Sequence, residues 1–389
     1  MSLLVSFILV LAALVIGEII STKTKAIIPS VFITAVLFLV GYWTIFPADI
    51  IAKAGFSTNI IYLSMYFLIT HMGTMLSVRE LIAQWKTLVI SIFGICGICI
   101  GTLLLGQLFF SWDMLVVATP PLTGGVVASI IMSEAAKANG LETLAVLAVG
   151  MYVMQGFAGY PLTAITLNME GKRLVEKFRK GELQLIKKDE NTTVEKKLIP
   201  PIPKKFQSTY VFLLQLGILS QISLFIANLT NKAVSEFVIC LVVGAIAAEL
   251  GFIERKPLNL SGTFGFFMTG LMAFIFGGLA QATPEMIKEL IVPFIGIIAF
   301  GVIGLVVLSI IAAKIFKESI PMSIAISLNA LYGFPVNYTL TNDAAKAIGK
   351  TDEEVEFLIE SMLPKMLIGG FASVTIISVV IAGVFAKML

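Results

Sequence analysis

Charged residues are scarce in this chain. Lys, Arg, Asp and Glu make up 13% of its 389 residues, whereas 58% are hydrophobic. A soluble domain of ordinary composition carries about 25% charged residues. The formal net charge of +3 comes mainly from one polar interval, so it does not indicate a nucleic-acid-binding surface. With a mean hydropathy of +0.99, the composition predicts an all-α polytopic membrane protein.

Residues and motifs that carry chemistry are also few. His71 is the single histidine, and Cys96, Cys99 and Cys240 lie in apolar stretches without a second ligand pair. Packing residues therefore explain the C-x-x-C better than a metal site or a disulfide framework. The spans contain no H-E-x-x-H, Ser/His pairing or aspartate dyad, and the chain has no G-x-x-x-x-G-K-[ST] loop. We expect neither an enzyme nor an ATP-driven pump, and the unbroken spans offer no polar lining for a channel.

Long apolar runs are abundant. They lie near 2–20, 26–46, 58–76, 87–110, 141–169, 209–229, 234–252, 262–282, 289–316 and 355–386. The first run lacks the basic start and cleavage site of a secretory signal, so we interpret it as a membrane helix. Residues 170–208 are charged and end in a Pro-rich stretch, which predicts a solvent-exposed linker. The linker separates two halves, 1–169 and 209–389.

Each half also contains one interrupted apolar run. The first covers 113–139 and is broken by Pro120, Pro121, Gly124 and Gly125; the second covers 320–348 and is broken around Gly333 and Pro335. The arms are too short to cross a bilayer, which needs about 20 helical residues. The octapeptide SEAAKANG at 133–140 recurs as NDAAKAIG at 342–349, at the same distance from Gly124 and Gly333 respectively. We interpret the two broken runs as copies of one duplicated element.

The distribution of basic residues predicts the membrane topology. If both broken runs are re-entrant hairpins, each half has five crossings, the halves are inverted repeats, and the linker is cytoplasmic. Most of the 27 Lys and Arg residues then lie on the cytoplasmic side. Full crossings at both breaks would move several of them outside. We therefore expect ten crossings and two oppositely oriented hairpins, with both termini outside.

Irregular backbone at membrane depth is tolerated where it is buried in protein or lines a cavity. The helix ends at a break offer N–H groups to an anion and carbonyls to a cation such as sodium. Matching breaks in two halves therefore predict a transporter site. The expected substrate-binding residues are Thr123, Gly124, Gly125, Ser129, Gln155, Asn329, Gly333, Asn337 and Lys365. The expected sodium-binding residues are Thr123, Gly124, Gly333 and Asn337.

The segments TPPLTGGVVAS and NALYGFPVN, the two-half layout and the basic linker together resemble the bacterial sodium/glutamate symporters. These belong to a broader group of inverted-repeat transporters that includes sodium/citrate symporters. The resemblance implies a multi-pass protein of the bacterial inner membrane that imports a carboxylate or amino acid with sodium. It also implies elevator-like movement and a homodimer. At the first break those symporters are expected to have Gly-Gly-His-Gly, whereas this chain has Gly124-Gly125-Val126-Val127. The second break of this chain reads Tyr332-Gly333-Phe334-Pro335.

Other residues leave alternatives open. His71 could bind substrate or relay a proton, although a hydrogen-bonded neutral histidine is the simpler interpretation. Lys365 is costly to bury without an anion, but its ammonium could also reach the cytoplasmic surface. Glu134 with Lys137, and Asp343 with Lys346, are expected to form surface pairs, and Gly94, Gly97 and Gly101 to permit close helix packing. A proton-coupled transporter, or an exporter of an organic anion, is the alternative function.

Overall fold

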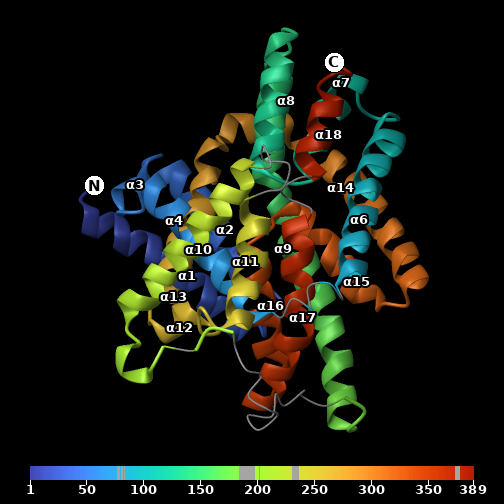
Figure 1. Cartoon of the computed structure of the whole chain (residues 1–389). Helices are drawn as coiled ribbons and strands as arrows, with labels where there is room; N and C mark the ends of the chain where they lie inside the picture. The colour runs from blue at the N-terminus through green and yellow to red at the C-terminus, as the bar shows by residue number, and fades with distance from the viewer. Residues whose placement is uncertain are drawn as a thin grey trace. The chain divides into compact units, whose positions relative to one another are not determined.

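The computed structural model describes residues 1–76, 79, 82, 84–183, 198–200, 202–229, 236–372 and 377–389 (Figure 1). Every regular element in these ranges is a helix, which confirms the all-α class. Each of the ten predicted apolar runs contains helix. Six helical stretches in the described ranges are long and apolar enough to cross a membrane. These are α1 (Leu3–Lys23), α6 (Trp85–Gly106), α9 (Glu142–Arg179), α10 (Thr209–Leu229), Phe264–Gln281 and α14 (Pro284–Phe316).

Local signals fix several helix starts. The Ser2 hydroxyl accepts a hydrogen bond from Val5 N–H at the start of α1, and the Thr283 hydroxyl accepts one from Met286 N–H at the start of α14. A capping hydroxyl satisfies a backbone donor that has no partner within the helix. Pro284 occupies the first position of α14, where its missing N–H costs nothing. The remaining apolar runs form α2 (Ser30–Thr44), α4 (Thr58–Met75), α11 (Glu236–Leu250), α13 (Phe264–Gly277), α17 (Asp352–Ala372) and α18 (Ser378–Phe385).

The chain forms two compact units that interleave in sequence. Unit 1 comprises Met1–Ile50, Lys86–Gln184 and Phe276–Leu389, and unit 2 comprises Ile51–Trp85 and Leu185–Ile275. Each unit therefore takes segments from both sides of the basic linker. The predicted repeat boundaries, 1–169 and 209–389, are a different division of the chain and stay a prediction. The solvent-exposed linker predicted for 170–208 begins too early, because α9 continues to Arg179 with Leu174 and Val175 buried.

Unit 2 is a small bundle in which α4 packs closely against α11. A Cβ at Gly73 would collide with the Leu241 backbone, and one at Gly244 would collide with the Thr70 carbonyl. Small residues at such crossings let two helix backbones approach each other. A hydrogen bond of 3.3 Å between the hydroxyls of Thr70 and Ser220 connects α4 to α10.

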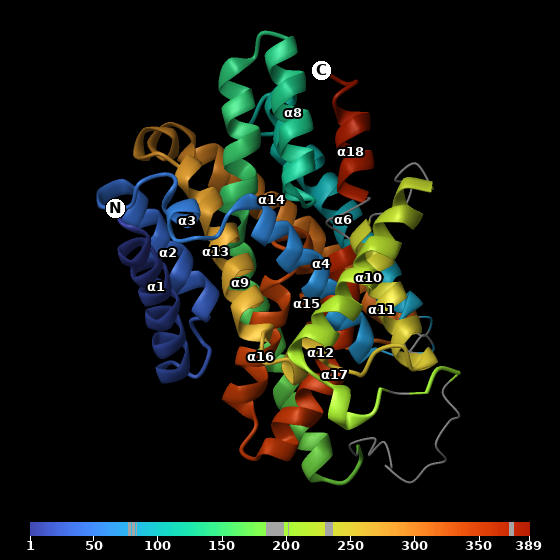
Figure 2. The same ribbon diagram turned by 60° about the vertical axis from the view of Figure 1, so that its left-hand side comes forward.

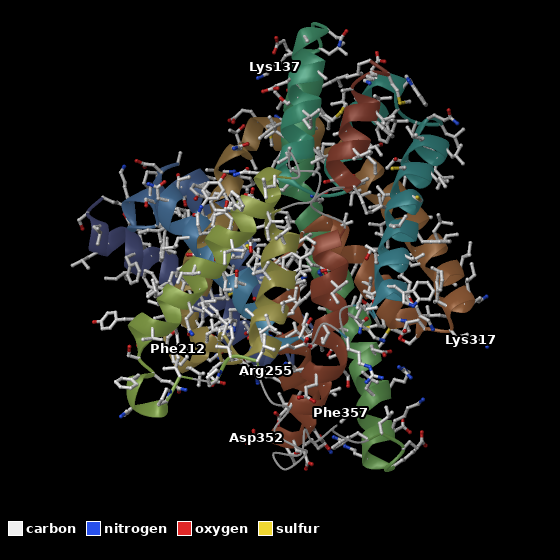
Figure 3. The ribbon with its side chains drawn as sticks, viewed as in Figure 1. Lys137, Phe212, Arg255, Lys317, Asp352 and Phe357 are labelled. Carbon is white, nitrogen blue, oxygen red and sulfur yellow. The ribbon has the colours of Figure 1, made fainter. Side chains whose placement is uncertain are left out.

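Unit 1 is built along α9. The two broken runs form helix–break–helix elements: hairpin 1, made of α7 (Trp112–Leu122) and α8 (Val126–Ala138), and hairpin 2, made of α15 (Ile320–Leu328), η3 (Asn329–Leu331) and α16 (Val336–Ile348). Hairpin 1 packs along the first part of α9, and α16 with α17 lies along its last part (Figure 2). Lys137 at the end of α8 and Asp352 at the start of α17 lie at opposite ends of this unit (Figure 3). The outer end of α8 and the start of α17 thus lie at opposite ends of this unit.

The glycine-rich face of α6 crosses α14 at close range. A Cβ at Gly97 would collide with the Gly304 carbonyl, and one at Gly101 would collide with the Phe300 carbonyl. This confirms the prediction that these glycines serve helix packing. Gly94 differs, because a Cβ there would meet the side chain of Ser327 in hairpin 2.

Candidate functional site at the two helix breaks

The first break follows the last turn of α7. Thr123 is fully buried, and its hydroxyl donates to the Pro120 carbonyl at 2.8 Å. Gly124 and Gly125 have φ values of 123° and 88°, which L side chains rarely adopt. Pro120 and Pro121 lie inside α7, so the chain breaks just after them. Because proline has no N–H, two carbonyls one turn earlier in α7 lack their usual intrahelical donor.

The second break lies between η3 and α16. Gly333 has a φ of 71°, so glycines at both breaks occupy the region that favours glycine. Its carbonyl accepts the Asn337 N–H at 3.2 Å. The Asn337 side chain is fully buried and donates from Nδ2 to the Met366 carbonyl at 2.9 Å. This bond connects the first turn of α16 to α17.

Asn329 and Asn337 converge on one position of α17. The Asn329 Nδ2 donates to the Ala325 and Ile326 carbonyls at 3.3 and 3.0 Å, while its Oδ1, also buried, has no hydrogen-bond partner among the described residues. A Cβ at Gly370 would lie 3.2 Å from Asn329 Oδ1 and would collide with Asn337 Nδ2. Glycine at 370 therefore lets both amides approach the α17 backbone. An unpaired buried amide oxygen costs about 1 to 3 kcal/mol, which a ligand would recover.

Gln155 of α9 is a second buried amide with an unpaired oxygen. It is 1% exposed, and its Oε1 has no partner in the described part of the chain. Gln155 lies between Met151 and Gly159 on one stripe of α9, because residues four apart share a helix face. Met151 belongs to the same core cluster as Leu331, and a Cβ at Gly159 would contact Leu331 and Tyr332. Gln155 thus lies on the face of α9 that packs against hairpin 2.

Both breaks border the same apolar cluster. This cluster contains Leu122 at the end of α7, Leu147 and Met151 of α9, and Leu328 and Leu331 of hairpin 2. Residues of both hairpins next to their breaks therefore lie in one core beside the first half of α9.

Two tyrosines add hydroxyl groups beside hairpin 2. The Tyr332 hydroxyl shares a hydrogen bond of 2.8 Å with Thr163, and the rings of Tyr332 and Tyr160 lie 5.8 Å apart between centroids. A Cβ at Gly156, next to Gln155 in sequence, would meet the Tyr160 hydroxyl at 2.5 Å. Tyr160 and Tyr332 thus provide ring surface and hydroxyls on the side of α9 next to Gln155, whose Oε1 has no hydrogen-bond partner among the described residues.

The remaining predicted residues have other partners or places. Ser129 is buried in the first turns of α8. Lys365 pairs with Glu318, with its Nζ 2.5 Å from the carboxylate. The Asp343 carboxylate accepts from the Ser30 hydroxyl at 2.6 Å, so this acid is held by α2 in addition to lying near Lys346.

The exposed residues Glu134 and Lys137 lie at the outer end of α8. His71 belongs to unit 2. It is 1% exposed, and its Nδ1 accepts the Leu258 N–H at 3.2 Å. The histidine therefore connects α4 to the start of the short helix α12 (Pro257–Leu260).

Several residues around the breaks were not predicted as site residues from the sequence. They are Tyr160, Thr163, Tyr332, Met366 and Gly370. Gly370 could have been recognised, because the stretch Gly370 to Ala372 matches Gly156 to Ala158 in the helix that follows hairpin 1.

The potential ligands at the two breaks are neutral oxygens of amides, hydroxyls and backbone carbonyls. Oxygen atoms of this kind bind hard cations. Among the described residues, no group of three or more His, Cys, Asp or Glu could hold a metal ion. A site built from these residues suits a weakly held alkali ion better than a transition metal. No protein-family model and no curated protein matches the chain.

Proposed function

We propose that this chain is a secondary active transporter that couples the movement of a small organic anion, a carboxylate or an amino acid such as glutamate, to sodium. One observation carries the proposal: two helix breaks border a single core, and beside them lie buried amide oxygens that have no hydrogen-bond partner in the described ranges. In most protein cores, buried polar atoms of this kind have hydrogen-bond partners. A ligand that binds at the breaks would supply partners to these amide oxygens.

The helix ends at the breaks support both ligands. The N-termini of α8 and α16, each 13 residues long, favour an anion through their N–H groups and partial positive charge. The carbonyls at the end of α7 and around η3 suit a sodium ion. Thr123, Gly124, Gly333 and Asn337 are the proposed sodium ligands, and sodium is the coupling ion, with no organic cofactor.

The positions of Lys137 and Asp352 at opposite ends of unit 1 support an opposite orientation of the two hairpins and, with it, alternating access. If each is re-entrant, each could open the shared core to its own side of the membrane. The proposal includes inverted repeats, elevator-like movement, a homodimer in a bacterial inner membrane and a cytoplasmic linker at 170–208. Reporter fusions at both termini and in the linker test the topology, and a cytoplasmic C-terminus would contradict it.

His71 makes proton coupling the weaker alternative. Its Nδ1 already accepts a backbone N–H, and protonation there would break that bond in a buried environment. Export of the anion is the other alternative, and the direction of transport decides it.

Uptake into proteoliposomes tests the proposal. We expect uptake of a small carboxylate to require an inward sodium gradient and to continue when a protonophore collapses the proton gradient. Loss of uptake with the protonophore, at constant sodium, would favour the proton-coupled alternative, and His71→Gln would be the first variant to test. Failure of sodium and of every carboxylate or amino acid to stabilise the purified protein would count against transport at the breaks.

A further inference from the structure

Basic residues are nearly absent from the helix interiors around the two breaks. Helices α2, α7, α15 and α18 contain no Lys or Arg, and neither do α4, α10, α11, α12 and α13 of unit 2. In α6, α8, α14 and α16 the basic residues lie near a helix end, and in α9 they lie within 172–179. Lys365 of α17 is the exception, and it directly precedes Met366, whose carbonyl accepts the Asn337 amide.

Glu318 already neutralises Lys365. Their charged groups are 2.5 Å apart, and the two side chains are 24% and 23% exposed. A second carboxylate on a substrate could use Lys365 only by leaving Glu318 unpaired. Separating a partly buried ion pair in this way is costly, because one charge stays behind without a partner. Among the described residues, the breaks therefore have no spare cation for a dicarboxylate.

The acids around hairpin 2 are engaged as well. Glu170 is held by Arg173 at 2.6 Å and by the Ser319 hydroxyl, and Asp343 accepts from Ser30. Glu170 and Glu318 are thus paired with cations, and Asp343 lies about two turns along α16 from the break, so none of these three carboxylates is placed to balance the ammonium of an amino acid there. An ammonium without a counter-charge in a buried site carries a large desolvation cost.

The groups that are available fit a different ligand. The N-termini of α8 and α16 each carry a partial charge of roughly half a positive unit, so together they balance the negative charge of one carboxylate. The unpaired oxygens of Asn329 and Gln155 accept hydrogen bonds, so they suit a hydroxyl donor as well as sodium. The rings of Tyr160 and Tyr332 suit a short carbon skeleton. One sodium ion with one carboxylate also makes a neutral cargo, which lowers the cost of burial in a membrane.

We propose that the substrate is a small monocarboxylate that bears a hydroxyl group and has no second charged group. This inference rests on the transport function proposed above and narrows its substrate class. It excludes dicarboxylates and α-amino acids as the preferred cargo.

A matched ligand series on the full-length purified protein tests the inference by thermal stability in sodium buffer. Lactate is the probe, propionate removes its hydroxyl, malate adds a carboxylate, and alanine and glutamate add an ammonium. We expect lactate to bind at least about tenfold more tightly than malate, alanine or glutamate, and several-fold more tightly than propionate. The stabilisation by lactate should weaken when potassium replaces sodium.

The outcomes separate the two proposals. Stabilisation by malate or glutamate that equals or exceeds that by lactate overturns the monocarboxylate inference and leaves the transport function standing. Absence of stabilisation by every ligand overturns both. Gly124→Ala and Asn337→Ala should each abolish the lactate effect, whereas Gly140→Ala, in the exposed α8–α9 turn, should retain it. Retention of the effect in all three variants would place lactate outside the breaks and overturn the inference.

Discussion

Hairpins 1 and 2 match in sequence pattern but are held in place in different ways. Small apolar residues dominate the surroundings of hairpin 1, where Ala128 and Ala136 of α8 share a cluster with Ala145 and Ala148 of α9. Contacts of this kind depend on shape and have little directional preference. The facing surfaces of α8 and α9 can therefore shift against each other without breaking a specific bond, although α7 is bonded to α6 through the Thr119 and Thr102 hydroxyls at 2.8 Å.

Hairpin 2 is bound by polar contacts along its length. Ser319 at its start donates to Glu170, Tyr332 at its break bonds Thr163, and Asp343 in its last arm accepts from Ser30. Each such bond contributes about 1 kcal/mol net, and leaving a buried partner unpaired costs more. From this comparison we expect hairpin 1 to move more easily than hairpin 2.

The largest effect is expected at the break glycines. At Gly124 and Gly333 the φ values of 123° and 71° place a Cβ in a strained conformation, which costs about 1 to 2 kcal/mol in the left-handed region. Gly124→Ala and Gly333→Ala should each lower sodium and substrate affinity by at least about tenfold. Binding to the purified variants, measured with their thermal stability, checks this.

Gly140→Ala is the matched control for the glycine variants. Gly140 also has a positive φ, of 73°, but it is exposed and a Cβ there would meet nothing within 4 Å. This variant should show the backbone strain without the loss of affinity. Equal losses in all three variants would mean that strain alone, and not the position at a break, explains the effect.

Asn337→Ala should have the next largest effect. It removes two hydrogen bonds, from Nδ2 to the Met366 carbonyl and from the Tyr338 N–H to Oδ1, at a cost of about 1 to 3 kcal/mol. If ligand binding depends on these bonds, affinity should fall by about 5- to 150-fold. Asn342→Ala is the control, because its amide donates to the Tyr338 carbonyl within the same helix and it is only half-buried. We expect less than about a twofold change there, and similar losses in both variants would contradict the assignment.

Hydrogen exchange of the unliganded protein tests the comparison between the hairpins directly. Backbone amides of α7 and α8 should exchange faster than those of α15 and α16, by about tenfold, since one or two net hydrogen bonds distinguish the two environments. Amides in the middle of α9 serve as the internal reference. Equal protection of both hairpins would remove the distinction between a mobile and a fixed arm.

Local signals explain what could be predicted from the sequence. Apolar runs and proline or glycine clusters act over a few residues, so they locate the helices and place the breaks next to Leu122 and Val336. The re-entrant course of the hairpins, the inversion of the halves and the coupling ion stay predictions.

Tertiary contacts explain what could not be predicted. The ionic partner of Lys365 is Glu318, 47 residues away, and the donor to His71 is Leu258, 187 residues away. No helical spacing connects such pairs. The proximity of Asn329 and Asn337 to Gly370 likewise depends on how α17 packs against hairpin 2, which composition and periodicity do not specify.

The smallest effect is expected from an ion pair at the hairpin 2 end of α9. The Arg179 guanidinium donates from Nε and Nη2 to the Glu354 carboxylate, both at 2.8 Å, and thereby connects α9 to the start of α17. The ring stack of Phe178 and Phe357, with centroids 4.5 Å apart, lies beside it. The hydrogen bonds from the Arg179 guanidinium and from the Lys350 N–H lower the pKa of the Glu354 carboxylate from 4.5 to about 2. Protonation of this carboxylate should therefore loosen the hairpin 2 end of α9 selectively.

The sign of the pH effect follows from this lowered pKa. Because the folded-state pKa is below the unfolded one, the pair stabilises the protein above about pH 4.5, and the contribution is lost as the pH falls through about 2. Arg179→Gln should lower thermal stability slightly near neutral pH, by an amount that shrinks below about pH 4.5. Lys180→Gln, which removes an exposed pair with Glu176, should change stability less.

The low pH that weakens the Arg179–Glu354 pair should also raise the hydrogen exchange of backbone amides in α16 more than in α8. A stability gap between Arg179→Gln and the parent that is independent of pH, or equal loosening of both hairpins, would show that this ion pair does not help to fix hairpin 2.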